Sequence, residues 1–231
     1  ILTGASQGIG VAIALKLLEL EYHVWGISRH APSFTHPHFH FVSCDLSQPS
    51  HVIQTCHHLT QTLPSVDVLI NNAGVGYFAP HEEISDQQLI DMAHINFLAP
   101  LLITKHTIRP LKKSQGWIIS ISSHSSKVPS RLGCAYASTK AALSHFQDSL
   151  FEEVRKSGIK VGTLIPDITN TPFFDTLSFA PSENPLSYLT PECVANGVAF
   201  MLSQRQGSVI TEMVLRPEIL QLDKKGKKKN S

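Results

Sequence analysis

Residues 1–10 read I-L-T-G-A-S-Q-G-I-G, and the apolar run V-A-I-A-L-K-L-L-E-L follows at 11–20. The pattern predicts a strand, a glycine-rich turn and a helix in immediate succession. Because the sequence starts inside that strand, we expect a few residues to precede Ile1. Glycines let a backbone approach a pyrophosphate, and a helix N-terminus offers unpaired N–H groups and a positive dipole end. The spacing G-x-x-x-G-x-G differs from the G-x-G-x-x-G of many dinucleotide sites, but this context favours dinucleotide binding over a plain turn.

The remaining chain alternates short apolar runs with helical patterns. We expect helices at 47–63, 85–113, 135–156 and 191–203, and further strands at 22–27, 38–44, 66–70, 117–122, 159–165 and 208–215. Strands that alternate with helices predict a parallel sheet covered on both faces. The expected fold class is α/β, a single Rossmann-like, doubly wound domain at 1–222 with a sheet of about seven strands. The lysine-rich segment 223–231 is expected to be a disordered tail.

The composition suits one globular domain and argues against several other classes of protein. The 231 residues are 42% apolar and 16% charged, with a formal net charge of +1. Five of the lysines lie in the tail, so the body is mildly acidic, which does not suggest a nucleic-acid-binding face. The sequence shows no signal peptide and no apolar run of transmembrane length. We therefore expect a cytoplasmic protein that binds neither nucleic acid nor membranes.

The cysteine and histidine patterns indicate neither disulfides nor a metal site. The four cysteines are scattered without C-x-x-C spacing, which is typical of free thiols in a reducing compartment. His36, His38 and His40 alternate along an expected strand, but no carboxylate or cysteine completes a familiar ligand set. We expect these histidines to be surface residues, and we expect no metal.

Polar residues follow several expected strands, at the edge where open α/β sheets bind ligands. Asp45-Leu46 and Asn71-Asn72-Ala73-Gly74 end two of these strands, and the segment 166–171, P-D-I-T-N-T, ends a third. The second strand ends in Ser28-Arg29, where an NAD site usually has an acidic residue. No carboxylate there repels a 2′-phosphate, and a guanidinium is available to bind it. The sequence therefore favours NADP(H) binding at Arg29 over the alternative that Arg29 is a surface residue without a ligand.

Tyr136 and Lys140 lie four residues apart near the start of an expected helix, so their side chains share one face. A cation beside a phenol lowers the pKa of the phenol from about 10, which allows proton exchange at neutral pH. Ser123 lies thirteen residues before Tyr136, at a strand end. Alone, the tyrosine–lysine spacing also fits an ordinary aromatic residue beside a solvated lysine, and Asn96 fits a structural role.

Residues 172–190 look irregular and contain three prolines, which predicts a mobile substrate lid. The apolar side chains of this segment indicate either an apolar or aromatic substrate or packing of the lid against the body. These side chains are Phe173, Phe174, Leu177, Phe179, Leu186 and Tyr188.

Taken together, these motifs resemble the short-chain dehydrogenase/reductase family over nearly the whole chain. T-G-A-S-Q-G-I-G at 3–10 matches the family's T-G-x-x-x-G-x-G turn, and N-N-A-G at 71–74 matches its motif after the fourth strand. Ser123 and the Y-x-x-x-K of Tyr136 and Lys140 match its catalytic residues, and Asn96 completes its tetrad. The resemblance implies reversible, NADPH-dependent reduction of a ketone or aldehyde. Tyr136 would donate the proton, Ser123 would hold the carbonyl oxygen, and Lys140 would lower the pKa of Tyr136 and bind the ribose. Asn96 would hold a relay water.

The resemblance also implies partners and cofactor contacts. We expect a small-molecule carbonyl or alcohol substrate, and a homodimer or homotetramer formed through the two long helices. The expected cofactor-binding residues are Gly4, Ser6, Gln7, Gly8, Ile9, Gly10, Ser28, Arg29, Asp45, Leu46, Asn72, Ala73, Gly74, Tyr136, Lys140, Pro166, Thr169 and Thr171.

Two positions depart from the family pattern. Pro166-Asp167 stands where the family usually has Pro-Gly, so Asp167 is expected to add a polar group near the nicotinamide. E-M-V-L-R-P-E at 212–218 replaces a common D-G-G signature, which argues against 3-oxoacyl-carrier-protein reductase in particular. Two other functions stay open. They are a cofactor-binding regulator or scaffold, which would be expected to lack one of the four tetrad residues, and a lyase or epimerase of the same fold.

Overall fold

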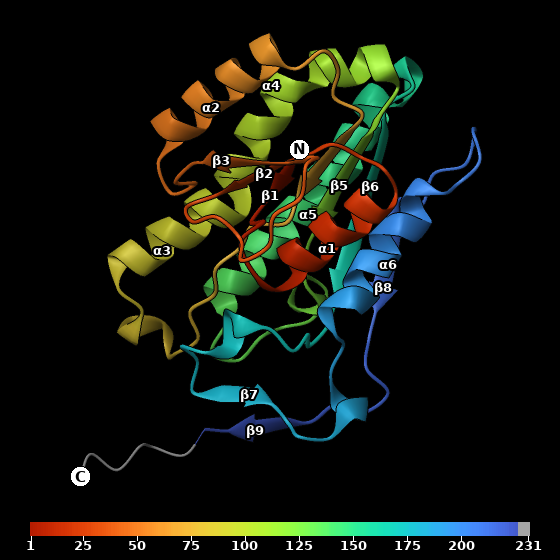
Figure 1. Ribbon diagram of the computed structural model, residues 1–231. Helices are drawn as coiled ribbons and strands as arrows, with labels where there is room; N and C mark the ends of the chain where they lie inside the picture. The colour runs from red at the N-terminus through yellow and green to blue at the C-terminus, as the bar shows by residue number, and fades with distance from the viewer. Residues whose placement is uncertain (226–231) are drawn as a thin grey trace.

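The computed structural model describes residues 1–225 of the chain. Its centre is a seven-stranded parallel sheet in the order β3-β2-β1-β4-β5-β6-β8 (Figure 1). This confirms the doubly wound fold predicted from the alternating pattern. The strands are β1 (Leu2–Thr3), β2 (Val24–Ser28), β3 (Phe39–Ser43), β4 (Val68–Asn71), β5 (Trp117–Ile121), β6 (Lys160–Pro166) and β8 (Glu212–Leu215).

Helices cover both faces of this sheet because successive strand residues point to opposite sides. On one face α1 (Gly8–Glu19) and α6 (Pro191–Leu202) pack against apolar residues such as Ile70 and Ile119. On the other face α2 (Pro49–Thr62), α4 (Ala99–Ser114) and α5 (Cys134–Val154) pack against their neighbours Leu69 and Ile118. Every strand of the sheet is parallel, so the loops after these strands lie along one edge.

No helix within residues 1–225 combines the length and apolar character needed to cross a membrane.

The expected helix over 85–113 is broken in its middle. α3 (Asp86–Ala93) starts with the predicted capping box, in which Ser85 Oγ accepts from the Gln88 N–H at 3.3 Å and Gln88 Oε1 accepts from the Ser85 N–H at 3.0 Å. A π-helical turn, His94–Leu98, separates α3 from α4. Such a turn adds residues per helical turn and is frequent at functional sites. Here it contains the fully buried Asn96.

The lid and the segment up to Lys225 contain more regular structure than the sequence indicated. The lid contains short 3₁₀ helices at Pro172–Phe174 and Pro185–Ser187 and the strand β7 (Phe179–Pro181). β7 pairs antiparallel with β9 (Leu222–Lys224), and the Lys225 N–H donates to the Ser178 carbonyl at 2.9 Å. The prediction that disorder begins at residue 223 is therefore wrong, because β7 gives residues 223 and 224 a backbone partner. The rest of that tail, 226–231, lies outside the described residues.

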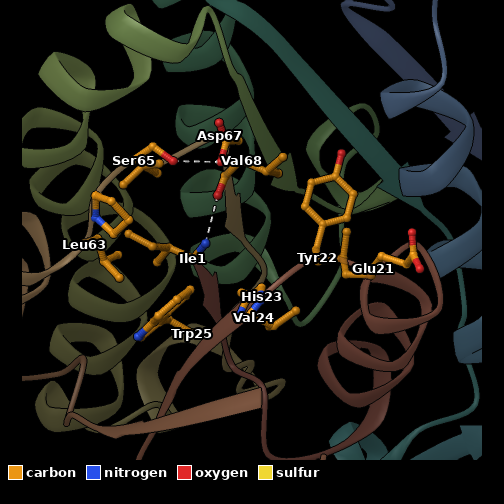
Figure 2. Close-up of a pocket in the computed structure, with 13 residues that line it drawn as sticks. Ile1, Glu21, Tyr22, His23, Val24, Trp25, Leu63, Ser65, Asp67 and Val68 are labelled. Atoms are coloured by element: carbon orange, nitrogen blue, oxygen red, sulfur yellow. Dashed lines mark hydrogen bonds between the residues drawn. The ribbon is translucent and has the colours of Figure 1, made fainter. Parts of the chain in front are cut away.

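A cavity of about 410 Å³ opens at the opposite edge of the sheet, where the strands begin (Figure 2). Tyr22, Trp25 and Asp67 are among its lining residues, and the Ile1 amino group donates to the Val68 carbonyl at 2.8 Å. None of the site residues predicted above lines this cavity. The predicted site residues lie at the other edge of the sheet, where the strands end.

Candidate active site

Two adjoining cavities lie at the carboxyl edge of the sheet. One, of about 280 Å³, runs over the glycine-rich turn, and the other, of about 550 Å³, lies beside the start of α5. Every residue expected to bind the cofactor lines at least one of them. Those in the first cavity are Gly4, Ser6, Gln7, Gly8, Ile9, Gly10, Ser28, Arg29, Asp45, Leu46, Asn72, Ala73, Gly74 and Thr171, while Tyr136, Lys140, Pro166 and Thr169 line the second.

The glycine-rich turn is held in a conformation that needs glycine. Gly4 has φ +70°, and a Cβ on Gly10 would lie 1.9 Å from the Gly4 carbonyl oxygen. The Asn72 amide donates to the Thr3 carbonyl at 2.9 Å and to the Gly4 carbonyl at 3.3 Å, which ties the end of β4 to this turn. The Asn72 side chain, predicted as a cofactor contact, therefore shapes the turn itself. α1 begins at Gly8, and its N-terminus offers N–H groups to an anion.

The segment after β2 presents two basic side chains to the first cavity. Ser28 is buried and donates its hydroxyl proton to the His30 carbonyl at 2.8 Å, so it shapes the turn. Arg29 and His30 are exposed and line the cavity. His30 was not predicted from the sequence, although its place just beyond the strand end was an available signal.

Asp45 follows β3 in the same cavity. Its Oδ1 accepts from the Ser47 N–H at 3.0 Å and from the Ser47 hydroxyl at 2.8 Å. Burial raises the pKa of Asp45, but the two Ser47 hydrogen bonds and the charges of Arg29 and His51 outweigh it and hold the pKa below its usual value. Asp45 is thus fixed as a carboxylate near Arg29.

Tyr136 and Lys140 lie side by side on the first turns of α5 and are 8% and 3% exposed. The Lys140 ammonium donates to the Ile121 carbonyl at 2.9 Å, which ties α5 to the end of β5. The Ser122 hydroxyl donates to the Lys140 carbonyl at 3.1 Å, and Ser123 follows directly. Tyr136, Lys140 and Ser123 all line the second cavity, as the spacing predicted.

Burial controls the pKa of both groups. It raises the pKa of Tyr136 to about 12, against the opposing effect of the nearby Ser123 hydroxyl. It lowers the pKa of Lys140 to about 8. We expected Lys140 to lower the pKa of Tyr136, and this is wrong for the protein alone, because loss of hydration outweighs any effect of the ammonium.

Asn96 reaches the site from the π-helical turn. Its Oδ1 accepts from the Val75 N–H at 2.8 Å, and its amide donates to the Val75 carbonyl at 2.8 Å and to the Thr139 hydroxyl at 3.0 Å. A Cβ added to Gly74 would lie 3.2 Å from Lys140 Nζ and 3.5 Å from Asn96 Oδ1. The space beside Gly74 is therefore within reach of both side chains.

Aromatic rings line the second cavity around Tyr136. The Phe78 ring lies 5.2 Å from the Tyr136 ring and 5.4 Å from the Phe179 ring, and the Phe173 ring lies 5.9 Å from Tyr136, measured between centroids. Phe174 also lines this cavity. Of the apolar lid residues for which the sequence left substrate contact or packing open, Leu177, Leu186 and Tyr188 do not line this cavity.

Three residues of this cavity, Arg216, Leu220 and Leu222, were not predicted from the sequence. Arg216 directly follows β8. Leu220 and Leu222 come next along the chain, and Leu222 is the first residue of β9. Pairing between β7 and β9 brings Leu222 to the site, and such pairing leaves no local pattern in the sequence. Arg216 could have been found, because it stands at the carboxyl end of an expected strand.

Asp167 places its carboxylate in the wall of the second cavity, and its expected position near the nicotinamide stays a prediction. Its Oδ1 accepts from the Ile168 N–H at 3.0 Å, and its Oδ2 accepts from Arg216 Nε at 3.0 Å and lies 3.7 Å from His124 Nδ1. One oxygen of the carboxylate is therefore bound by the adjacent backbone N–H, and the other lies near the side chains of Arg216 and His124 in the wall of the second cavity.

Comparisons with known proteins agree with this arrangement. The model of the short chain dehydrogenase family matches residues 1–180. An uncharacterized oxidoreductase of Staphylococcus epidermidis is 27% identical over 225 residues, covering 94% of this chain and 96% of that protein. The structure of an alcohol dehydrogenase from the archaeon Thermococcus sibiricus, complexed with 5-hydroxy-NADP, has a TM-score of 0.82 and 25% identity over 94% of each chain. A metagenomic short-chain oxidoreductase in complex with NADP has a TM-score of 0.78 and 27% identity over 94% of this chain and 96% of that chain.

Proposed function

Because this chain belongs to the short-chain dehydrogenase family, we propose that it is an NADPH-dependent oxidoreductase that reduces a ketone or aldehyde to an alcohol, reversibly. One observation carries this proposal. Tyr136, Lys140 and Ser123 lie together in a largely apolar cavity that adjoins the cavity over the glycine-rich turn, and Gly74 lines both. A hydride carrier in the first cavity and a carbonyl compound in the second would meet at these side chains.

The residues of the first cavity fit a dinucleotide phosphate. The glycine-rich turn leaves room at the N-terminus of α1 for a pyrophosphate, and after β2 Arg29 offers a positive charge and His30 an imidazole ring. The expected acid is absent from the segment 24–30, so nothing there repels a 2′-phosphate. The two relatives whose structures contain NADP or an NADP derivative support the same choice. When bound, NADPH supplies the hydride.

The chain's own groups would handle the proton and the oxygen. Tyr136, with its pKa raised to about 12, holds its proton at neutral pH and can donate it to the substrate oxygen as that oxygen gains charge. The Ser123 hydroxyl, beside Tyr136 in the same cavity, would donate a hydrogen bond to that oxygen. The Lys140 ammonium would stabilise the tyrosinate left behind and bind the ribose. Asn96 and Lys140 would hold the relay water at the position beside Gly74.

The rate of reduction should fall as the pH rises through about 8. Reduction needs the proton on Tyr136 and the charge on Lys140, and Tyr136 stays protonated well above this range. Lys140, whose pKa is lowered to about 8, is charged below that pH and loses its charge above it. We expect kcat/KM for reduction at saturating NADPH to be level below about pH 7 and to decline above about pH 8. A rate that rises through this range would contradict the assignment of Lys140.

Gly74→Ala should slow turnover without weakening NADPH binding to the same degree. The added methyl group would take the space between Lys140 Nζ and Asn96 Oδ1, and we expect a loss of about 10²-fold in kcat. Kinetics at saturating NADPH measure the loss in kcat, and a separate titration measures the change in NADPH affinity. If the shared space is what matters, Asn96→Ala and the double variant should show losses that are not additive. Additive losses would indicate that the two residues act independently.

A titration with NADPH and with NADH, followed by nicotinamide fluorescence, tests the proposal as a whole. A panel of ketones and aldehydes should then consume the cofactor that binds more tightly. Binding without oxidation of the cofactor by any compound would favour the regulator or scaffold. Formation of product without net consumption of NADPH would favour a lyase or epimerase.

Assembly and location stay predictions. The helices α4 and α5, through which we expect a homodimer or homotetramer, carry their apolar residues mainly toward the sheet. Light scattering of the purified protein would give the oligomeric state. Microscopy of the tagged protein in its own cells would test the expected cytoplasmic location.

A further inference from the structure

We infer that the substrate of this enzyme is an oxo compound that carries an anionic group, and that Arg216 binds that group. The inference rests on the proposed function, because it concerns the second cavity as a substrate site. The carbonyl carbon gains the hydride and the carbonyl oxygen gains the Tyr136 proton, while the anionic group is unchanged.

An imidazole, a carboxylate and a guanidinium form one cluster in the wall of this cavity. His124, Asp167 and Arg216 follow the ends of the neighbouring strands β5, β6 and β8. Asp167 Oδ2 lies 3.0 Å from Arg216 Nε and 3.7 Å from His124 Nδ1. His124 is next to Ser123, so this cluster begins beside the group expected to hold the substrate oxygen. Nothing in the proposed chemistry at Tyr136 requires it.

Asp167 holds the Arg216 guanidinium at Nε and leaves its two Nη groups open to a ligand. The Asp167 side chain is 11% exposed, and its other oxygen accepts from the Ile168 N–H, so the carboxylate is held in place. Its hydrogen bond to the guanidinium is accepted from Nε, and the Arg216 side chain is 51% exposed. Within residues 1–225 the two Nη atoms of Arg216 have no hydrogen-bond acceptor. A guanidinium anchored at Nε presents both Nη groups as a planar fork, which matches a carboxylate or a phosphate.

The charge around this cavity is not balanced within the described part of the chain. Arg131, Lys140 and Arg216 line it, and Asp167 is the one carboxylate that does so. Glu212, which stands nearby on β8, pairs instead with Lys127 outside the cavity. With Lys140 assigned to the proton transfer, two guanidiniums face one carboxylate. An anionic substrate would restore the balance, and a positive cavity would attract it.

The other residues that line this cavity indicate what kind of substrate body it can bind. Phe78, Phe173 and Phe179 lie on one side, and Leu220 and Leu222 lie on the same C-terminal segment as Arg216. Apolar surface of this kind binds an apolar or aromatic body. The expected substrate class is therefore an oxo acid or a phosphorylated ketone with an apolar body, and both share an oxyanion that a guanidinium can bind.

Matched pairs of substrates test this inference on the full chain. An aromatic oxo acid is compared with its methyl ester, and a keto phosphate with its dephosphorylated form. The wild-type protein should reduce at least one anion with kcat/KM about 10-fold or more above its neutral partner. Whichever pair shows the larger ratio identifies carboxylate or phosphate as the bound group.

Arg216→Gln should remove this preference. We expect KM for the preferred anion to rise about 10-fold to 100-fold, so that the ratio of kcat/KM between the anion and its neutral partner falls toward one. Arg216→Lys should restore part of the affinity, because it keeps the charge but not the fork. Arg205→Gln, which removes an exposed guanidinium outside both cavities, is the matched control and should have no effect. Inhibition of the wild-type enzyme by benzoate but not by benzamide is a second readout that needs no variant.

The outcomes separate this inference from the proposed function. Equal use of anionic and neutral partners, with no change in Arg216→Gln and no inhibition by benzoate, would overturn the inference and leave the reductase standing. If no carbonyl compound of either kind oxidises NADPH, the proposed function fails and the inference fails with it.

Discussion

Replacing Tyr136 with Phe is expected to lower kcat for carbonyl reduction by about 10³-fold or more, with little change in NADPH binding. The substitution removes one hydroxyl group and keeps the ring, which packs against Phe78 and Phe173 at 5.2 Å and 5.9 Å between centroids. Folding should therefore be preserved, and the site should lose only its proton donor. Single-turnover oxidation of bound NADPH measures the chemical step, and a fluorescence titration measures the binding.

Tyr22→Phe is the matched control for this experiment. It makes the same chemical change in the cavity at the opposite edge of the sheet (Figure 2), so turnover should stay at the wild-type rate. If Tyr136→Phe kept turnover near the wild-type rate, another group would have to supply the proton. Ser123 would then be the first candidate, because it lines the same cavity.

Replacing Arg29 with Asp is expected to reverse the choice of cofactor. We expect the dissociation constant for NADPH to rise about 100-fold or more, because a hydrogen-bonded cation is lost and a carboxylate then faces the 2′-phosphate. Affinity for NADH should be unchanged or higher, because the new acid can accept from the ribose hydroxyls. Arg29 is exposed and lines the cavity, so the change should cost little stability. Parallel titrations with both cofactors measure the ratio.

Two further variants define what the Arg29 result means. Arg205→Asp introduces the same charge change on a surface away from both cavities and should leave both affinities unchanged. His30→Ala should weaken NADPH binding less than Arg29→Asp does, because it removes a neighbouring basic group without adding an acid. Equal binding of NADPH by the wild-type protein and by Arg29→Asp would show that the phosphate is bound elsewhere, and that NADP(H) was wrongly assigned to this turn.

The sheet and much of the site follow from local patterns in the sequence. Short apolar runs marked all seven strands, and the parallel order confirmed the expected fold. Family membership is also confirmed. Because the carboxyl ends of parallel strands share one edge, the residues picked at those ends lie in adjoining cavities. The roles assigned to Asn96, Ser123, Tyr136 and Lys140 stay predictions until variants are measured.

The features that were missed depend on contacts between distant parts of the chain. Leu222 reaches the cavity because β9 pairs with β7, some forty residues earlier. The raised pKa of Tyr136 follows from burial that the complete fold creates, whereas the spacing to Lys140 indicated the opposite direction. The break at Asn96 depends on a π-helical turn that the capping box and apolar periodicity did not reveal. Each of these needed the three-dimensional structure.

Transfer of deuterium from NADPH labelled at C4 of the nicotinamide tests the central claim most directly. Each of the two C4 epimers is incubated with the enzyme and a ketone that it consumes, and the alcohol is analysed by mass spectrometry. The proposed function predicts that one epimer delivers its deuterium to the carbinol carbon, and that Tyr136→Phe prevents the transfer. Product that carries no deuterium from either epimer, formed while the labelled cofactor stays reduced, would contradict hydride transfer and point to a lyase or epimerase.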